Sequence, residues 1–231
     1  MASPAYDAWL FDLDGTLIDI EPDHPRWVFD EIGDRLGREF TDREVTVLWH
    51  GLGGPRNEQL RAWGVDPEPF WAAFHEIEDP IRRAEATFVY DDAERLLAAL
   101  DRPIGVVTHS QTHLTEAALD RLDIADWFDT VVCCDDDIGW KPDPAPVERA
   151  LADLGVAGNG HESVLVGDSP GDVGAAWNAG LDAAHVERFD PHERGQCVRA
   201  EYRVDRLDAL WNLPATDGGI SDQNSADETD S

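Results

Sequence analysis

Five short, almost wholly apolar runs recur along this chain, with helix-forming segments between them. The runs are Ala8–Phe11, Ile104–Thr108, Thr130–Cys133, Ser163–Val166 and Ala183–Val186. Strands that are apolar on both faces are typical of a parallel sheet covered by helices on each side. Amphipathic patterns fill most of the intervals, at Asp92–Leu100, Thr112–Leu122, Pro144–Leu154 and Pro170–Ala179. The alternation predicts an α/β fold built on a doubly wound, Rossmann-like parallel sheet.

The interval between the first two runs is too long for one crossover helix, and its pattern is helical throughout. It holds four of the nine tryptophans, Trp27, Trp49, Trp63 and Trp71. Because aromatic side chains dominate small cores, we expect them to form a separate core rather than a ligand site. We predict a core of residues 1–18 and 89–213, an inserted all-helical cap at 19–88, and a disordered acidic tail at 214–231. Such a cap overhangs the carboxyl ends of the strands, where open sheets bind ligands.

The charge balance constrains both surroundings and partners. The chain has 49 Asp and Glu against 18 Lys and Arg, a formal net charge of −31, and a single lysine. That charge opposes folding at low ionic strength, whereas in molar salt the Debye length falls to about 3 Å. We interpret the composition as halophilic rather than merely acidic. It argues against binding to nucleic acid or anionic membranes, and the one basic pair, Arg82–Arg83, is expected on a helix surface.

No feature of the sequence points to a membrane or secreted protein. The N-terminus lacks a basic segment followed by an apolar one, and no apolar run is long enough to span a bilayer. Cys133, Cys134 and Cys197 form neither a disulfide framework nor a zinc-binding spacing. We expect a cytoplasmic protein that is a monomer or homodimer.

Acidic residues follow two of the predicted strands. Asp12 and Asp14 come at the end of the first strand, ahead of Gly15, and Asp168 ends the fourth. A doubly wound sheet is expected to place Asp168 beside Asp12. Carboxylates gathered at a sheet edge are costly unless they bind a metal or a partner. Since Mg²⁺ takes oxygen ligands and keeps waters and a substrate phosphate, we expect Mg²⁺ at this edge.

The single lysine, Lys141, is a second signal of chemistry. Arginine has taken the place of lysine elsewhere in the chain. Its planar fork cannot replace a compact ammonium beside a carboxylate and a phosphate. Together with the aspartates, Lys141 indicates a site for phosphoryl transfer.

Four segments resemble the motifs of the haloacid dehalogenase superfamily, in that family's order. They are Asp12–Thr16, Thr108, Lys141 before Pro142, and Gly167–Asp172. The resemblance spans about residues 8–186, and the insertion resembles the class with a helical cap after the first motif, which includes phosphoglycolate phosphatases. It implies a Mg²⁺-dependent phosphatase acting on a small phosphorylated metabolite such as phosphoglycolate.

The resemblance also implies roles for single residues. Asp12 would be the nucleophile that forms an aspartyl-phosphate, and Asp14 the general acid and base. The side chains of Asp12 and Asp168, with the backbone carbonyl of Asp14, would hold Mg²⁺. Thr108 and nearby amides would cradle the phosphoryl oxygens, and Lys141 would neutralise charge between nucleophile and phosphate.

Three further residues have two interpretations each. Asp172 would orient Lys141 or a metal-bound water, although a first-turn acid also suits the helix dipole with no catalytic duty. His109 stands where the family often has Asn, and a tolerated substitution that offers a backbone amide is favoured over direct catalysis. Arg56 follows a Gly-rich loop, and it either meets the non-phosphoryl end of the substrate or belongs to an ordinary turn.

Other activities of the same superfamily remain open. The acid at position 14 favours a phosphatase over a haloacid dehalogenase, because a dehalogenase needs no acid or base there. The motifs do not separate a phosphatase from a phosphomutase, which returns the phosphoryl group. A non-catalytic phosphate-binding protein is the remaining alternative, and the intact motifs argue against it.

Overall fold

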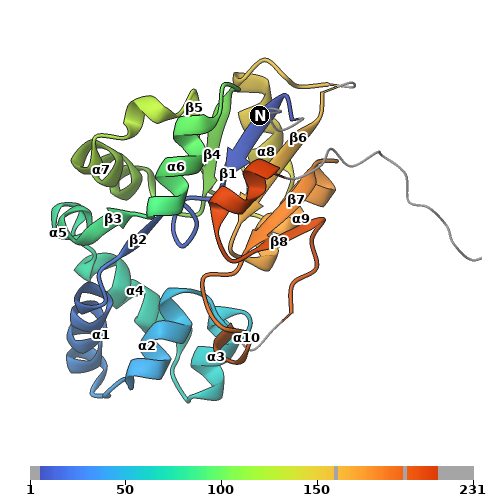
Figure 1. Ribbon diagram of the computed structural model, residues 1–231. Helices are drawn as coiled ribbons and strands as arrows, with labels where there is room; N and C mark the ends of the chain where they lie inside the picture. Colours follow the sequence, from blue (N-terminus) through green and yellow to red (C-terminus); the bar gives the residue numbers. More distant parts are fainter. Residues whose placement is uncertain (1–5, 159–160, 195–196, 213–231) are drawn as a thin grey trace, which may run out of the picture.

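The larger part of the protein, here called the sheet part, consists of a six-stranded parallel sheet and the helices that cover it (Figure 1). The computed structural model describes residues 6–158, 161–194 and 197–212. The strands run in the order β5-β4-β1-β6-β7-β8, and neighbours pair in parallel. Their bounds are β1 (Ala8–Phe11), β4 (Ile104–Thr108), β5 (Thr130–Cys133), β6 (Ser163–Gly167), β7 (Asp182–Val186) and β8 (Tyr202–Val204). The chain moves outward from β1 in both directions, which confirms the predicted doubly wound fold and puts the switch point at the end of β1.

Helices cover both faces of this sheet. Trp9 and Phe11 of β1 belong to a core cluster with α6 (Asp91–Ala99), α7 (Thr112–Leu122) and the 3₁₀ helix η2 (Leu207–Asn212). Leu10 points the other way, into a cluster with α8 (Ala145–Asp153) and α9 (Pro170–Asn178). Successive side chains of a strand face opposite sides, so both faces of β1 are buried, as its apolar sequence predicts. Short helices η1 (Ala125–Trp127) and α10 (Pro191–Arg194) lie in the connections.

Four helices between β1 and β4 form a unit with its own core, here called the helical module. They are α1 (Asp23–Leu36), α2 (Asp42–Trp49), α3 (Arg56–Ala62) and α4 (Pro67–Ile77). Phe29, Phe70 and Leu60 are buried at its centre, and the four tryptophans of the insertion pack against this core. A capping box in which Thr41 and Glu44 bond each other's backbone N–H begins α2.

The connections to the helical module differ from the prediction. The expectation of helix throughout 19–88 is wrong at both ends, because β2 (Ile18–Ile20) and β3 (Thr87–Val89) pair there as antiparallel strands. Strands of three residues are too short to show a period in sequence. A further helix, α5 (Pro80–Ala86), packs against α7 of the sheet part. The division at 18/19 and 88/89 stays a prediction.

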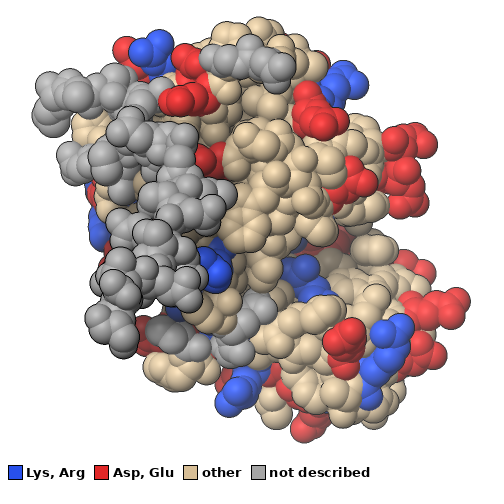
Figure 2. Space-filling model, turned by 90° about the vertical axis from the view of Figure 1, so that its right-hand side faces the viewer, with Lys and Arg blue, Asp and Glu red and all other residues tan. Residues whose placement is uncertain are grey.

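Two further expectations concern the ends and the surface. The tail predicted at 214–231 lies outside the described residues. Among the residues that are described, no helix has the length and apolar character needed to cross a bilayer. Figure 2 shows Asp and Glu side chains spread over the margins of both the upper and lower parts of one face.

Candidate active site

The first strand ends in a turn that packs against a second acidic residue. The N–H of Asp12 donates to the carbonyl oxygen of Val166 at 2.8 Å, and the Asp12 side chain is buried. Gly15 then turns the chain with a φ of 78°. A Cβ at Gly15 would lie 2.5 Å from Oδ2 of Asp168, so only glycine allows this approach. The loops after β1 and β6 therefore bring Asp12 and Asp168 to one edge of the sheet.

Three carboxylates meet at this edge. Oxygen atoms of Asp12, Asp168 and Asp172 lie within 4.8 Å of one another. Burial raises the pKa of Asp168 well above its usual range, and Asp12 and Asp172 raise it further. Burial also raises the pKa of Asp12, to about 7, although the Lys141 ammonium opposes this rise. A buried set of carboxylate oxygens with such unfavourable charge fits a divalent cation of the Mg²⁺ type.

The single lysine lies inside this cluster. Nζ of Lys141 is 2.6 Å from Oδ1 of Asp12 and 2.6 Å from Oδ1 of Asp172. It also donates to the carbonyl oxygen of Val107 at 2.8 Å. Burial alone would lower the pKa of Lys141, but the two carboxylates raise it above its usual value. The ammonium is therefore held charged beside Asp12, in the place predicted for it.

Asp172 combines both of its predicted interpretations. One oxygen, Oδ2, accepts from the N–H of Ser169 at 2.9 Å, which completes the capping box that begins α9. The other oxygen faces Lys141. A Cβ at Gly167 would collide with the Asp172 side chain, so the glycine at the end of β6 makes room for it. The helix cap thus fixes the carboxylate that contacts the lysine.

The loop after β4 presents polar groups to the same edge. Thr108 is buried, and its Oγ1 accepts from the N–H of Ser110 at 3.0 Å, which leaves the hydroxyl hydrogen free to donate. His109 lies against Trp140, with 5.4 Å between ring centroids. Burial and the Lys141 ammonium lower the pKa of His109, so its imidazole is neutral at pH 7. A neutral imidazole is compatible with both interpretations of His109.

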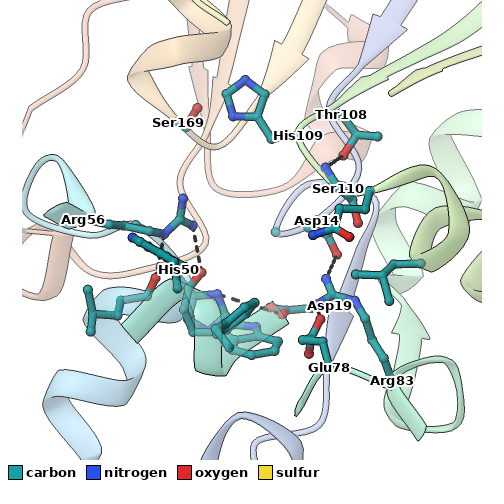
Figure 3. Close-up of a pocket in the computed structure, with 18 of the residues that line it drawn as sticks. Asp14, Asp19, His50, Arg56, Glu78, Arg83, Thr108, His109, Ser110 and Ser169 are labelled. Atoms are coloured by element: carbon teal, nitrogen blue, oxygen red, sulfur yellow. Dashed lines mark hydrogen bonds and ion pairs between the residues drawn. The ribbon is translucent and has the colours of Figure 1, made fainter. Parts of the chain in front are cut away.

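Asp14 points away from the carboxylate cluster. Its Oδ1 accepts from Nη2 of Arg83 at 2.9 Å (Figure 3). The expectation that Arg82–Arg83 lies on a helix surface is therefore wrong for Arg83, whose side chain is only 11% exposed. It holds for Arg82, which is exposed and lies 3.4 Å from the centroid of the Trp27 ring. Arg82 and Arg83 differ in exposure because one side of α5 packs against α7 of the sheet part.

Arg56 has a structural partner and a position in the cavity. Its Nε donates to the carbonyl oxygen of Leu48 at 2.7 Å and its Nη2 to that of Trp49 at 2.9 Å. These are the last carbonyl groups of α2, so Arg56 caps that helix. Figure 3 shows the guanidinium extending from α3 toward the centre of the cavity. The two predicted interpretations, substrate contact and ordinary turn, are therefore compatible.

A cavity of about 320 Å³ separates the sheet edge from the helical module. From the sheet part it is lined by Asp12, Asp14, Asp19, Thr108, His109, Ser110 and Asp168. From the helical module and α5 it is lined by Trp49, His50, Arg56, Trp71, Phe74, Glu78 and Arg83, among others. The predicted site residues at the strand ends thus face charged and aromatic side chains across this cavity.

Sequence reasoning missed several polar residues of this cavity, among them Asp19, His50, Glu78 and Arg83. Asp19 and His50 lie 3.9 Å apart at their closest side-chain atoms, and Glu78 pairs with Arg83 at 2.7 Å. No local motif marks these residues. Their ion-pair partners lie 5 to 69 positions away in the sequence, and whether the pairs form depends on how the helices pack. The one signal in the sequence that could have drawn attention to Arg83 is that two arginines stand side by side in a strongly acidic chain.

Comparison with known proteins gives relatives over most of the chain. The pyrophosphatase PpaX of Bacillus velezensis is 33% identical over 193 residues, which is 80% of this chain and 85% of that protein. The phosphoglycolate phosphatase of Yersinia pseudotuberculosis is 32% identical over 183 residues, 74% of this chain and 76% of that protein. Both names describe enzymes that act on phosphorus–oxygen bonds.

Solved structures share the fold at lower identity. A haloacid dehalogenase-like family protein of Streptococcus pneumoniae aligns with a TM-score of 0.70 and 17% identity, over 89% of this chain and 96% of that one. A crystal structure from Lactobacillus plantarum aligns with a TM-score of 0.72 and 23% identity, over 89% and 98%. The family model for haloacid dehalogenase-like hydrolases matches residues 6–180. This chain, with its acidic cluster and its buried lysine, therefore belongs to the haloacid dehalogenase-like hydrolases.

Proposed function

We propose that this protein is a Mg²⁺-dependent phosphatase that hydrolyses a small phosphorylated metabolite through an aspartyl-phosphate at Asp12. One observation carries the proposal: a buried carboxylate that lines the cavity, Asp12, lies 2.6 Å from the only lysine of the chain. A buried acid beside a fixed positive charge suits nucleophilic attack on an anionic phosphoryl group. The phosphatase names of relatives near 30% identity support the same activity.

The residues divide the reaction into two displacements. In the first, Asp12 forms a bond to phosphorus while the bond from phosphorus to the leaving oxygen breaks, and Asp14 gives that oxygen a proton. In the second, Asp14 takes a proton from water as the water attacks phosphorus, which frees inorganic phosphate and restores Asp12. Lys141 offsets the charge between nucleophile and phosphate, and the Thr108 hydroxyl donates to a phosphoryl oxygen.

The donor set at the sheet edge suits Mg²⁺. Asp12 and Asp168, with the backbone carbonyl of Asp14, would hold the ion, while Lys141 and the α9 cap keep Asp172 occupied. When bound, Mg²⁺ supplies charge neutralisation for the nucleophile and the phosphoryl oxygens. The pKa of Asp168 is raised by burial and by the neighbouring carboxylates, which agrees with a cluster that favours an added positive charge.

The substrate is proposed to carry a second anionic group, and phosphoglycolate is the leading candidate. Arg56 lines the cavity from α3, whereas Asp12 lines it from the end of β1, and Arg56 retains Nη1 for a ligand after its two bonds to α2. Inorganic pyrophosphate meets the same requirement, and one relative is named for it. A cavity of about 320 Å³ admits either molecule together with water.

Phosphate release from a panel of phosphorylated metabolites tests the proposal. Phosphoglycolate, pyrophosphate and sugar phosphates would be compared in molar KCl with Mg²⁺, for the wild type and for Asp12→Asn. Release that the variant lacks supports the mechanism, and the preferred compound identifies the substrate class. Transfer between two sugar positions without release of phosphate would indicate a phosphomutase instead, and no turnover with metal bound would indicate a binding protein.

The surroundings are proposed to be a salt-rich cytoplasm. A net charge of −31 with one lysine among 18 basic residues supports this. The protein is proposed to act as a monomer or homodimer.

A further inference from the structure

The guanidinium of Arg83 joins two carboxylates that come from different parts of the protein. Its Nη2 donates to Oδ1 of Asp14 at 2.9 Å, and its Nη1 donates to Oε2 of Glu78 at 2.7 Å. The side chains of Arg83 and Glu78 are 11% and 3% exposed, whereas that of Asp14 is 35% exposed. Arg83 is therefore held firmly on the Glu78 side and reaches the cavity on the other (Figure 3).

The three residues lie on three separate elements. Asp14 is in the turn after β1, and Glu78 ends α4 of the helical module. Glu78 also contacts Nε2 of His24 in α1 at 3.3 Å, which adds a second link to the module. Arg83 is on α5, which packs against α7 of the sheet part. One side chain thus connects the helical module to the strand-end turn.

The energetics fix the orientation of this side chain. The Glu78 side chain is almost completely buried, and a buried carboxylate is strongly destabilising when its cationic partner is removed. Glu78 therefore requires one edge of the guanidinium. Because the guanidinium is planar and rigid, fixing Nη1 on Glu78 also fixes the direction in which Nη2 points. The ammonium of a lysine, on a flexible stem, would not be constrained in this way. Nη2 points toward Asp14.

We propose that Arg83 is a positioning residue for Asp14, and that its bond to Glu78 makes the placement of the Asp14 carboxylate depend on the helical module. The inference rests on the proposed function, in which Asp14 protonates the leaving oxygen. The Asp14 carboxylate lies partly open to solvent in the turn after β1, and its ion pair among the described residues is the one with Arg83. Arg83 holds the carboxylate in one orientation while the module is in place.

Leaving groups of different basicity distinguish positioning from a general structural role. A proton from Asp14 is needed when an alkoxide leaves, and is hardly needed when p-nitrophenolate leaves. The value of kcat/KM reports steps up to the first irreversible one, here the loss of the leaving group. A fault in Asp14 placement should therefore lower kcat/KM for an alkyl phosphate far more than for p-nitrophenyl phosphate.

The experiment compares Arg83→Met with Arg82→Met, its neighbour on α5, whose guanidinium lies on Trp27 outside the cavity. We expect Arg83→Met to lower kcat/KM for the preferred alkyl phosphate at least tenfold more than for p-nitrophenyl phosphate, and Arg82→Met to change neither. Because Arg83→Met leaves the buried Glu78 carboxylate with only His24 beside it, the double variant Arg83→Met/Glu78→Gln is measured as well. An equal loss with both substrates, or no loss, in a folded variant would overturn the proposal.

A second background tests whether Arg83 acts through Asp14. In Asp14→Asn, adding Arg83→Met should cause little further loss, since the carboxylate to be positioned is already gone. Additive losses would overturn the inference. Failure of the proposed function has a different signature. If the wild type releases no phosphate from any compound, or if release does not depend on Asp12, both the proposed function and the positioning role of Arg83 are refuted. Release that depends on Asp12 and shows no leaving-group effect in Arg83→Met sinks only the positioning role.

Discussion

The ammonium nitrogen of Lys141 lies 2.6 Å from Oδ1 of Asp12, with the two side chains 2% and 10% exposed. The carbonyl oxygen of Val107 and Oδ1 of Asp172 occupy the other directions around that nitrogen, at 2.8 and 2.6 Å. Three oxygens at this distance fit the compact ammonium of lysine, which has three hydrogen-bond donors. They leave no room for the larger, planar guanidinium of arginine. This explains why one lysine persists in a chain that otherwise uses arginine.

Lys141→Arg should therefore be close to inactive. We expect kcat to fall by about 100-fold or more, the range found when a group that stabilises transition-state charge is removed. The control is Arg149→Lys, an exposed pair with Asp153 on α8, which should alter neither kcat nor stability measurably. Steady-state kinetics with circular dichroism of each variant checks the result. Retention of more than half of wild-type kcat in Lys141→Arg would contradict a point-charge role.

Mg²⁺ should bind tightly to the folded protein, and this binding should depend on Asp168. We expect Mg²⁺ to raise the unfolding temperature, because a ligand at 100 times its Kd adds about 2.7 kcal/mol of stability. In Asp168→Asn this shift and the calorimetric affinity should fall at least tenfold. Asp30→Asn, which changes an exposed acid of α1, should leave both unchanged. An Asp168→Asn protein with wild-type Mg²⁺ affinity would place the metal elsewhere.

Two glycines of one motif should respond differently to alanine. Gly167→Ala puts a Cβ where the Asp172 side chain lies, whereas the atoms nearest a Cβ at Gly171 are at 3.4 Å or more. We expect Gly167→Ala to displace Asp172 from Lys141, to cost about 1–3 kcal/mol of stability by overpacking, and to lower kcat. Gly171→Ala should be nearly neutral. Urea unfolding and kinetics of both variants test this, and equal behaviour of the two would refute it.

Stability should decline as the pH falls below about 6.5, in part through His185. This side chain of β7 is 1% exposed, and burial lowers its pKa. The folded state then keeps the ring neutral while the unfolded state takes up a proton near pH 6.5. The contribution is fully present above that pH and is lost as the pH falls toward the folded pKa, by at most about 1.4 kcal/mol per pH unit. His185→Gln should flatten the slope of urea-unfolding stability between pH 8 and 5.5, and an unchanged slope would contradict the assignment.

Salt should stabilise the protein by screening. The unfolding temperature is expected to rise steadily from 0.1 to 2 M KCl, because a net charge of −31 repels itself less as the Debye length shrinks. Replacing exposed acids of α1, for example Glu31→Gln with Asp34→Asn, should raise the unfolding temperature at low salt and reduce its dependence on KCl. NaCl should act like KCl. A flat or falling curve would argue against the halophilic interpretation.

Most of the sheet could be predicted from the sequence, for a clear physical reason. Strands buried on both faces, such as Ile104–Thr108, are apolar at nearly every position, and this produces a recognisable apolar run in the sequence. The adjacency of Asp12 and Asp168 follows from the strand order alone. The strand Tyr202–Val204 escaped prediction because an edge strand of three residues, with exposed Arg203 at its centre, has no such run.

The cavity wall opposite the aspartates could not be predicted in the same way. Arg83 pairs with Asp14 across 69 positions of sequence, and that pairing depends on how α5 packs against α7. Arg83 and Arg82 are adjacent in the sequence, and no local pattern distinguishes Arg83 from Arg82, which is exposed. Long-range ion pairs in a chain with 49 acids have too many alternative partners for any one to be chosen from the sequence.

The antiparallel pairing of β2 with β3 has an evolutionary consequence. Ile18 pairs with Val89 and Ile20 with Thr87, so the chain leaves the sheet part and returns to it at adjacent points, about 4.8 Å apart. An insertion joined through two neighbouring points can change in length or shape without altering any other connection. Descendants of one ancestor can therefore exchange the helices on one side of the cavity while inheriting the same segments at the strand ends on the other side.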